Sequence, residues 1–304
     1  MIQVGIFSGY FPYDLETTAK TIRNLGFNTV QLDLHFKDVD LSAGQITKEK
    51  AKRVADTFRD HDLPVCAISG YTNIVHPDLE HRRSNVERLK EIIRNARDFG
   101  SAYVISESGT FNPDSEWDHD PHNRTEDAYE QVRDVLAELA QEAYDHGATF
   151  LLETYVNNVI GSVRETVRVF NDIRSPGLDL VSDPTNYFDE NNIDDMDAVL
   201  NEVFDTLGDR VRIAHAKDVK RAGDDKSEKH ADIGDDDALA SHTFRGVGEI
   251  ELPAAGLGSL NYDLYLQRLS ERNPNVPLII EHLDESDVPR AKKFVTDTLK
   301  AYSI

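Results

Sequence analysis

The sequence predicts a single α/β domain, a closed barrel in which eight parallel strands alternate with helices, and three observations favour this fold. Short apolar runs recur along the chain, and such runs are typical of parallel strands that are buried on both faces. Segments with helical periodicity separate these runs. The length of 304 residues suits one barrel of ~250 residues with insertions. Together these observations predict a (β/α)8 TIM barrel over residues 1–304.

The first half of the chain contains four strand–helix units. Gln3–Phe7 is the first strand, and its helix begins near Leu15 because Asp14 is a preferred N-cap residue. The loop between them, FSGYFPYD, lacks the glycine spacing of a nucleotide-binding turn, which disfavours a doubly wound sheet. We predict the next strands over 28–34, 65–71 and 101–108, and their helices over 47–60, 84–99 and 125–146.

Four further apolar runs follow, and each ends in an acidic or imidazole side chain. The runs are TFLLE, LDLVSD, VRIAH and PLIIE, and they end at Glu153, Asp183, His215 and Glu281. A last helix is predicted over 288–302. Because the C-terminal strand ends of a β/α barrel meet at one mouth, we expect these four side chains to lie together there.

Two segments are too polar for a barrel strand or a packed helix. Residues 111–124 read FNPDSEWDHDPHNR, and residues 218–245 are dense in Asp, Lys and Gly. Long loops of this kind are usually functional in compact domains. We therefore predict a loop insertion and a flap at the mouth of the barrel.

The charge balance is strongly acidic, with 56 Asp plus Glu against 33 Lys plus Arg and a net charge of −23. This excess repels phosphate backbones, which disfavours DNA or RNA as a partner. Asp outnumbers Glu, and the acids are spread along the chain. We interpret this as adaptation of the surface to high salt, with an ordinary acidic protein as the alternative.

The chain has neither a membrane-length apolar run nor a basic segment at its start, so we expect a cytoplasmic protein without an anchor or signal peptide. Its one cysteine, Cys66, lies in the apolar run LPVCAI, where a buried and unreactive thiol is expected.

Three carboxylates and one imidazole at a barrel mouth are a suitable ligand set for a divalent ion such as Mn²⁺, Mg²⁺ or Co²⁺. The motifs LLETY, SDPTNYF, HAKD and IIEHL, with a G-x-G-x-I element before the last, stand in the order found in a known superfamily. The chain resembles the xylose isomerase-like barrels, specifically their sugar (phosphate) isomerase and epimerase branch. The resemblance covers nearly the whole chain.

This resemblance implies that Glu153, Asp183, His215 and Glu281 hold one divalent ion, most often manganese, with Mg²⁺, Co²⁺ or Zn²⁺ as alternatives. It also implies that the two glutamates move a proton next to a ketose carbonyl, through an enediolate that the ion stabilises. The expected partner is a small-molecule sugar or sugar phosphate, and members of the family are often dimers or tetramers.

Six further residues are candidates for substrate binding. Asn186 stands where many relatives have a histidine, and it can donate a hydrogen bond but cannot shuttle protons. Lys217 follows His215 by two positions, so on a strand it points the same way. The other candidates are Arg221, Arg245, Glu107 and His76.

Three other functions remain open at this point. A dehydratase acting on a keto-inositol would use the same ligands, because loss of water also passes through an enediolate. An apurinic endonuclease would need further histidines, where this chain has ISGYT, SESGT and Asn186. A member without catalytic activity is the third alternative.

Overall fold

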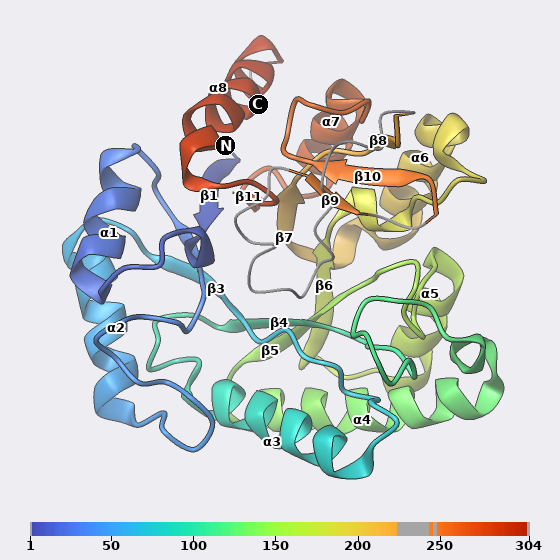
Figure 1. Cartoon of the computed structure of the whole chain (residues 1–304), viewed down its shortest axis with the longest axis horizontal. Coiled ribbons are helices and arrows are strands. Elements are labelled where there is room, and N and C mark those ends of the chain that lie inside the picture. Colours follow the sequence, from blue (N-terminus) through green and yellow to red (C-terminus); the bar gives the residue numbers. More distant parts are fainter. Residues whose placement is uncertain (1, 224–242, 246–247, 303–304) are drawn as a thin grey trace.

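The computed structural model describes residues 2–223, 243–245 and 248–302, and it confirms the predicted (β/α)8 barrel. Eight parallel strands close in the order β1-β11-β7-β6-β5-β4-β3-β2. Helices surround this barrel on all sides (Figure 1). The strands are β1 (Gln3–Phe7), β2 (Val30–Leu32), β3 (Val65–Ser69), β4 (Tyr103–Glu107), β5 (Thr149–Glu153), β6 (Leu178–Ser182), β7 (Val211–Ala216) and β11 (Pro277–Ile280).

Most of the α-helices begin where a short polar side chain caps them. Asp14, Thr47 and Thr125 each accept a hydrogen bond from a backbone N–H in the first turn of α1, α2 and α4. The α-helices are α1 (Leu15–Asn24), α2 (Lys48–Asp60), α3 (Leu79–Asn95), α4 (Glu126–Asp145), α5 (Val163–Ile173), α6 (Met196–Leu207), α7 (Tyr262–Arg272) and α8 (Val288–Ala301).

The predicted bounds of α3 are wrong at both ends. The helix begins at Leu79 rather than near residue 84, because the Asp78 side chain accepts from the backbone N–H groups of Glu80 and His81. Its first turns, LEHRRSN, are almost wholly polar, so they carry no apolar periodicity. The helix ends at Asn95, and a run of turns continues to Gly100, whose positive φ of 88° ends the segment.

A small antiparallel sheet, which was not predicted, follows the seventh barrel strand. It contains β8 (Lys220–Arg221), β10 (Ile250–Pro253) and β9 (Thr243–Arg245), in that order. These strands are only two to four residues long, and β8 pairs with a strand far along the chain. Most of the predicted flap, residues 224–242, lies outside the described residues. Segment 111–124 has one 3-10 helix, Pro121–Arg124, and no other helix or strand.

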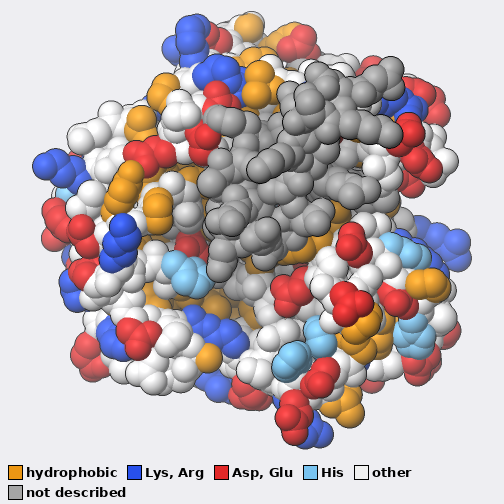
Figure 2. Space-filling model, viewed as in Figure 1, with side chains coloured by type: hydrophobic (Ala, Val, Ile, Leu, Met, Phe, Trp, Pro, Cys, Tyr) orange, Lys and Arg blue, Asp and Glu red, His pale blue; other side chains and the backbone are white. Residues whose placement is uncertain are grey.

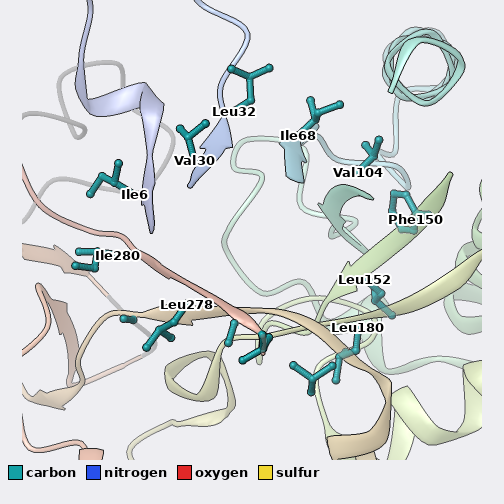
Figure 3. Close-up of a cluster of buried hydrophobic side chains, with 14 of the residues drawn as sticks. Ile6, Val30, Leu32, Ile68, Val104, Phe150, Leu152, Leu180, Leu278 and Ile280 are labelled. Atoms are coloured by element: carbon teal, nitrogen blue, oxygen red, sulfur yellow. The ribbon is translucent and has the colours of Figure 1, made fainter. Parts of the chain in front are cut away.

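Alternation along the strands divides the barrel's apolar side chains into two layers. Residues such as Phe150 and Leu152 of β5 point outward into the core between strands and helices (Figure 3). The residue between them, Leu151, points into the barrel. Six fully buried inner residues form a cluster of their own, namely Ala67, Ile105, Leu151, Val181, Ile213 and Ile279.

Acidic and basic side chains are interspersed over the visible surface rather than gathered by sign (Figure 2). Many form exposed ion pairs, such as Arg53 with Asp38 and Arg94 with Glu142. Among the described residues, no helix has the length and apolar character that a membrane span requires.

Candidate active site

The polar site lies one layer above the inner apolar cluster. Residues two apart on a strand face the same side of the sheet, so the residue two after each inner apolar residue also points into the barrel. These residues are Ser69, Glu107, Glu153, Asp183, His215 and Glu281, each two positions after a member of the inner cluster. The strand register therefore gathers carboxylates and an imidazole at one level of the barrel.

His215 is at the centre of this polar layer. Its Nδ1 atom lies 3.4 Å from Oε1 of Glu153, 3.5 Å from Oδ2 of Asp183 and 3.3 Å from Oε2 of Glu281. All four residues are at least nine-tenths buried. Nevertheless, this Nδ1 atom makes no hydrogen bond within the described part of the chain. A buried nitrogen that faces three carboxylate oxygens is the arrangement expected around a cation.

The residues present fit a divalent ion. Atoms of Glu153, Asp183 and His215 lie within 4.8 Å of one another, so this buried group is able to hold a metal. Carboxylate oxygens and a neutral imidazole suit divalent ions of hard or borderline character. Glu281 lies against the same His215 nitrogen and could complete the set.

Neighbouring side chains hold the two glutamates in place. The Tyr71 hydroxyl donates a short hydrogen bond to Oε2 of Glu153, and the Asn186 amide donates to Oε1 over 2.7 Å. The Gln31 amide donates to Oε1 of Glu281 over 3.1 Å. Each glutamate is thus oriented before any ligand binds.

Lys217 and Asp183 form a buried ion pair within this site. The distance from Nζ to Oδ2 is 2.6 Å, and both side chains are almost completely buried. Burial alone would raise the pKa of Asp183, but the Lys217 ammonium and the His215 imidazole hold it well below its usual range. Burial lowers the pKa of His282, and Lys217 lowers it further, so His282 is neutral and its Nε2 can accept from Nζ over 3.4 Å.

The crowding of carboxylates perturbs their titration. Burial raises the pKa of Glu281 to about 7, with Glu153 adding to the rise while His215 and Lys217 oppose it. Burial and the charge of Glu153 also raise the pKa of Glu107 well above its usual range. Burial disfavours a charged His215, yet Glu281 and Glu153 raise its pKa well above the usual range. This pocket therefore attracts positive charge strongly.

The structure brings some of the predicted substrate-binding residues together and leaves others apart. Glu107, Asn186 and Lys217 lie with the four ligand candidates. His76 lies in the loop before α3, where its Nδ1 accepts from the Asp78 N–H. Arg221 is partly exposed and pairs with Asp194, away from the cluster. Arg245 ends β9, and its side chain lies outside the described residues.

Sequence reasoning missed three residues of the site. Gln31 is the one polar residue of β2, and that polarity inside a buried strand was an available signal. Tyr71 follows β3 by two positions and carried no signal of its own. His282 has a left-handed backbone with φ of 58°, which is strained for a residue other than glycine and is often found next to functional groups.

The sequence matches a family model described as xylose isomerase-like TIM barrel over residues 19–298. The chain belongs to this family. None of the curated proteins matches it. The family assignment agrees with the resemblance inferred from the four strand-end motifs.

Solved structures of this fold are similar over their whole length. L-ribulose 3-epimerase has a TM-score of 0.69 and 17% identity, and the match covers 99% of this chain and 95% of that one. A xylose isomerase-like TIM barrel protein from Mycobacterium smegmatis in complex with magnesium has a TM-score of 0.67 and 17% identity, over 98% and 95%. The probable 3-DHS dehydratase AsbF from Bacillus anthracis has a TM-score of 0.68 and 14% identity, over 100% and 99%. These matches show that the fold is shared.

Proposed function

We propose that this protein is a metal-dependent isomerase or epimerase that acts on a ketose sugar or its phosphate. One observation carries the proposal: the buried Nδ1 atom of His215 has no hydrogen bond to any described residue and faces three carboxylate oxygens at 3.3 to 3.5 Å. The proposed ligands are Glu153, Asp183, His215 and Glu281. Manganese is the proposed ion.

The bound ion would act as a Lewis acid that stabilises the negative charge of an enediolate. In this mechanism one of the two glutamates, Glu153 or Glu281, takes the proton from the carbon next to the substrate carbonyl. The other glutamate returns a proton to the enediolate. Both glutamates come from the same polar layer but from different strands, β5 and the end of β11, so they can approach a substrate from two sides. A raised pKa, as burial gives Glu281, suits a group that must both accept and release a proton near neutral pH.

The neighbouring residues would orient the reacting groups. Tyr71 and Asn186 each donate to one oxygen of Glu153, so its carboxylate cannot rotate freely. The Lys217 ammonium lies within the same pocket and can donate to a substrate oxygen as well as to Asp183. Because Glu153, Asn186 and Lys217 are buried, these groups are shielded from bulk water.

The similar structures support this class of reaction. One of them is an L-ribulose 3-epimerase, and epimerisation at that position is a proton transfer next to a carbonyl. Another was solved in complex with magnesium. At under 25% identity these proteins show the fold alone, and the proposal rests on the three carboxylates that face Nδ1 of His215.

A dehydratase is the second candidate. The probable 3-DHS dehydratase shares the fold over its whole length, and removal of water can begin with the same proton abstraction. The same two glutamates would then serve, with one of them protonating the leaving hydroxyl. A keto-inositol is the substrate class proposed for this alternative.

The test begins with the metal content of protein purified without a chelator. The metal-loaded protein is then incubated in D₂O with ketoses, ketose phosphates and keto-inositols, and deuterium uptake next to the carbonyl is measured. Uptake with retention of the hydroxyls supports the isomerase or epimerase, and uptake with loss of water supports the dehydratase. Metal-free protein that shows the same uptake, or cleavage of abasic DNA by the loaded protein, would contradict the proposal.

A further inference from the structure

Gln31 links the imidazole and one glutamate of the proposed metal site. Its side chain is completely buried and points into the barrel from β2, while its neighbours Val30 and Leu32 point outward (Figure 3). The amide nitrogen donates to Oε1 of Glu281 and to Oγ of Ser69, each over 3.1 Å. The amide oxygen lies 2.9 Å from Nε2 of His215.

The carboxylate of Glu281 determines which way the amide points. A carboxylate that binds a metal ion is ionised and only accepts hydrogen bonds, so the NH₂ group of Gln31 must face it when the ion is bound. The reversed amide would place two acceptor oxygens against each other at the 3.1 Å contact. With the NH₂ group facing Glu281, the amide oxygen necessarily faces His215.

The amide oxygen in turn determines where the imidazole proton lies. An imidazole that binds a metal ion is neutral and has one N–H, and an acceptor 2.9 Å from Nε2 retains the proton on that nitrogen. Nδ1 then presents its lone pair to the three carboxylates. Without this acceptor, the same carboxylates at 3.3 to 3.5 Å would attract the proton to Nδ1, where it would compete directly with a cation.

We propose that Gln31 is a positioning residue that fixes the tautomer of His215, so that Nδ1 is the metal-binding nitrogen, and that it orients Glu281 at the same time. This inference rests on the proposed function, because it assumes that the four residues bind a divalent ion. Hydrogen-bond partners of metal-binding histidines commonly change metal affinity about 10- to 100-fold when they are replaced.

The test uses Co²⁺ as the probe ion. The dissociation constant is measured by calorimetry for the chelator-treated wild type, Gln31→Met, Gln31→Glu and Ser69→Ala. Met matches the length of Gln but cannot donate a hydrogen bond, and its sulfur is only a weak acceptor. Glu retains the acceptor for Nε2–H. Ser69→Ala is the matched control, because it removes one contact of the same amide and leaves His215 and Glu281 in contact with Gln31.

Affinity should fall about 10- to 100-fold in Gln31→Met and change less than about 3-fold in Ser69→Ala. Proton NMR of the Co²⁺-loaded protein gives a second measurement. The wild type should show one strongly shifted, exchangeable N–H signal from the bound imidazole. Its exchange with D₂O should be slow in the wild type and in Gln31→Glu, and at least ~10-fold faster in Gln31→Met.

If Gln31→Met binds Co²⁺ with the same dissociation constant as the wild type, the inference is overturned. Bound Co²⁺ in the wild type without a slowly exchanging N–H signal would overturn it as well, and this result needs no variant to fold. Wild-type protein that binds no Co²⁺ at all would instead overturn the proposed function, and with it this inference.

Discussion

Replacing Lys217 by Met should destabilise the metal-free protein markedly. Met keeps most of the side-chain length but removes the charge that lies 2.6 Å from the Asp183 carboxylate. Removing one partner of a buried ion pair costs about 3–5 kcal/mol, because the other charge is left without compensation. We expect about 3 kcal/mol, the lower end of this range, because His215 also faces Asp183 at 3.5 Å.

A divalent ion beside Asp183 would change this result. The ion would supply positive charge in place of the ammonium, so the loss should shrink to about 1 kcal/mol in the metal-loaded protein. The difference of about 2 kcal/mol corresponds to roughly thirty-fold tighter metal binding by the variant than by the wild type.

The assay is urea unfolding of the wild type and the variant, in chelator and in saturating Mn²⁺. Lys293→Met is the control, because Lys293 pairs with Asp297 on the exposed face of α8 and its removal should barely change the unfolding midpoint. If Lys217→Met and Lys293→Met lowered the free energy of unfolding equally, the buried ion pair of Lys217 and Asp183 would be refuted. The same loss for Lys217→Met in chelator and in Mn²⁺ would refute an ion close to Asp183.

Three further predictions follow from the sequence and the site. Asp183→Ala should abolish metal retention, since it removes a carboxylate that faces Nδ1 of His215; one equivalent of metal in the purified variant would exclude Asp183 as a ligand. With a net charge of −23, the unfolding temperature should rise as KCl goes from dilute to molar, because salt screens carboxylate repulsion; a flat or falling temperature would indicate an ordinary acidic protein. Cys66 is only partly buried, yet loss of hydration raises the pKa of its thiol to about 11, so at pH 8 its thiolate fraction, and its rate with a thiol reagent, should be roughly 100-fold below those of an ordinary cysteine. A rate near that of free cysteine would contradict this.

The sequence predicted most of the barrel because its strands and helices follow local rules. Apolar runs located the strands, the capping residue Asp14 located the start of α1, and periodicity located the start of α4 to within a residue. Apolar periodicity did not predict the start of α3, because the first turns of this helix are polar. Only the capping residue Asp78 marks where it begins. The sheet of β8, β10 and β9 was not predicted, because its short strands depend on pairing between distant segments.

The candidate site was predictable only in part, because contacts between side chains do not follow local rules. Position at a strand end was enough to bring Glu153, Asp183 and His215 together, since the register of a parallel barrel places such residues at one level. The contacts between side chains were not predictable. That Lys217 pairs with Asp183, or that Gln31 contacts both His215 and Glu281, depends on rotamers and strand order rather than on any local pattern.

Glu153 and Glu281 are proposed to transfer a proton in a metal-dependent reaction. The most direct measurement is the rate of deuterium incorporation next to the carbonyl of the identified substrate, in D₂O, for metal-loaded wild type, Glu153→Gln and Glu281→Gln. Both variants must first be shown to hold the ion. Each replacement should slow the incorporation by at least ~100-fold, the loss expected for a positioned acid or base. Incorporation at the wild-type rate in either loaded variant would contradict the account.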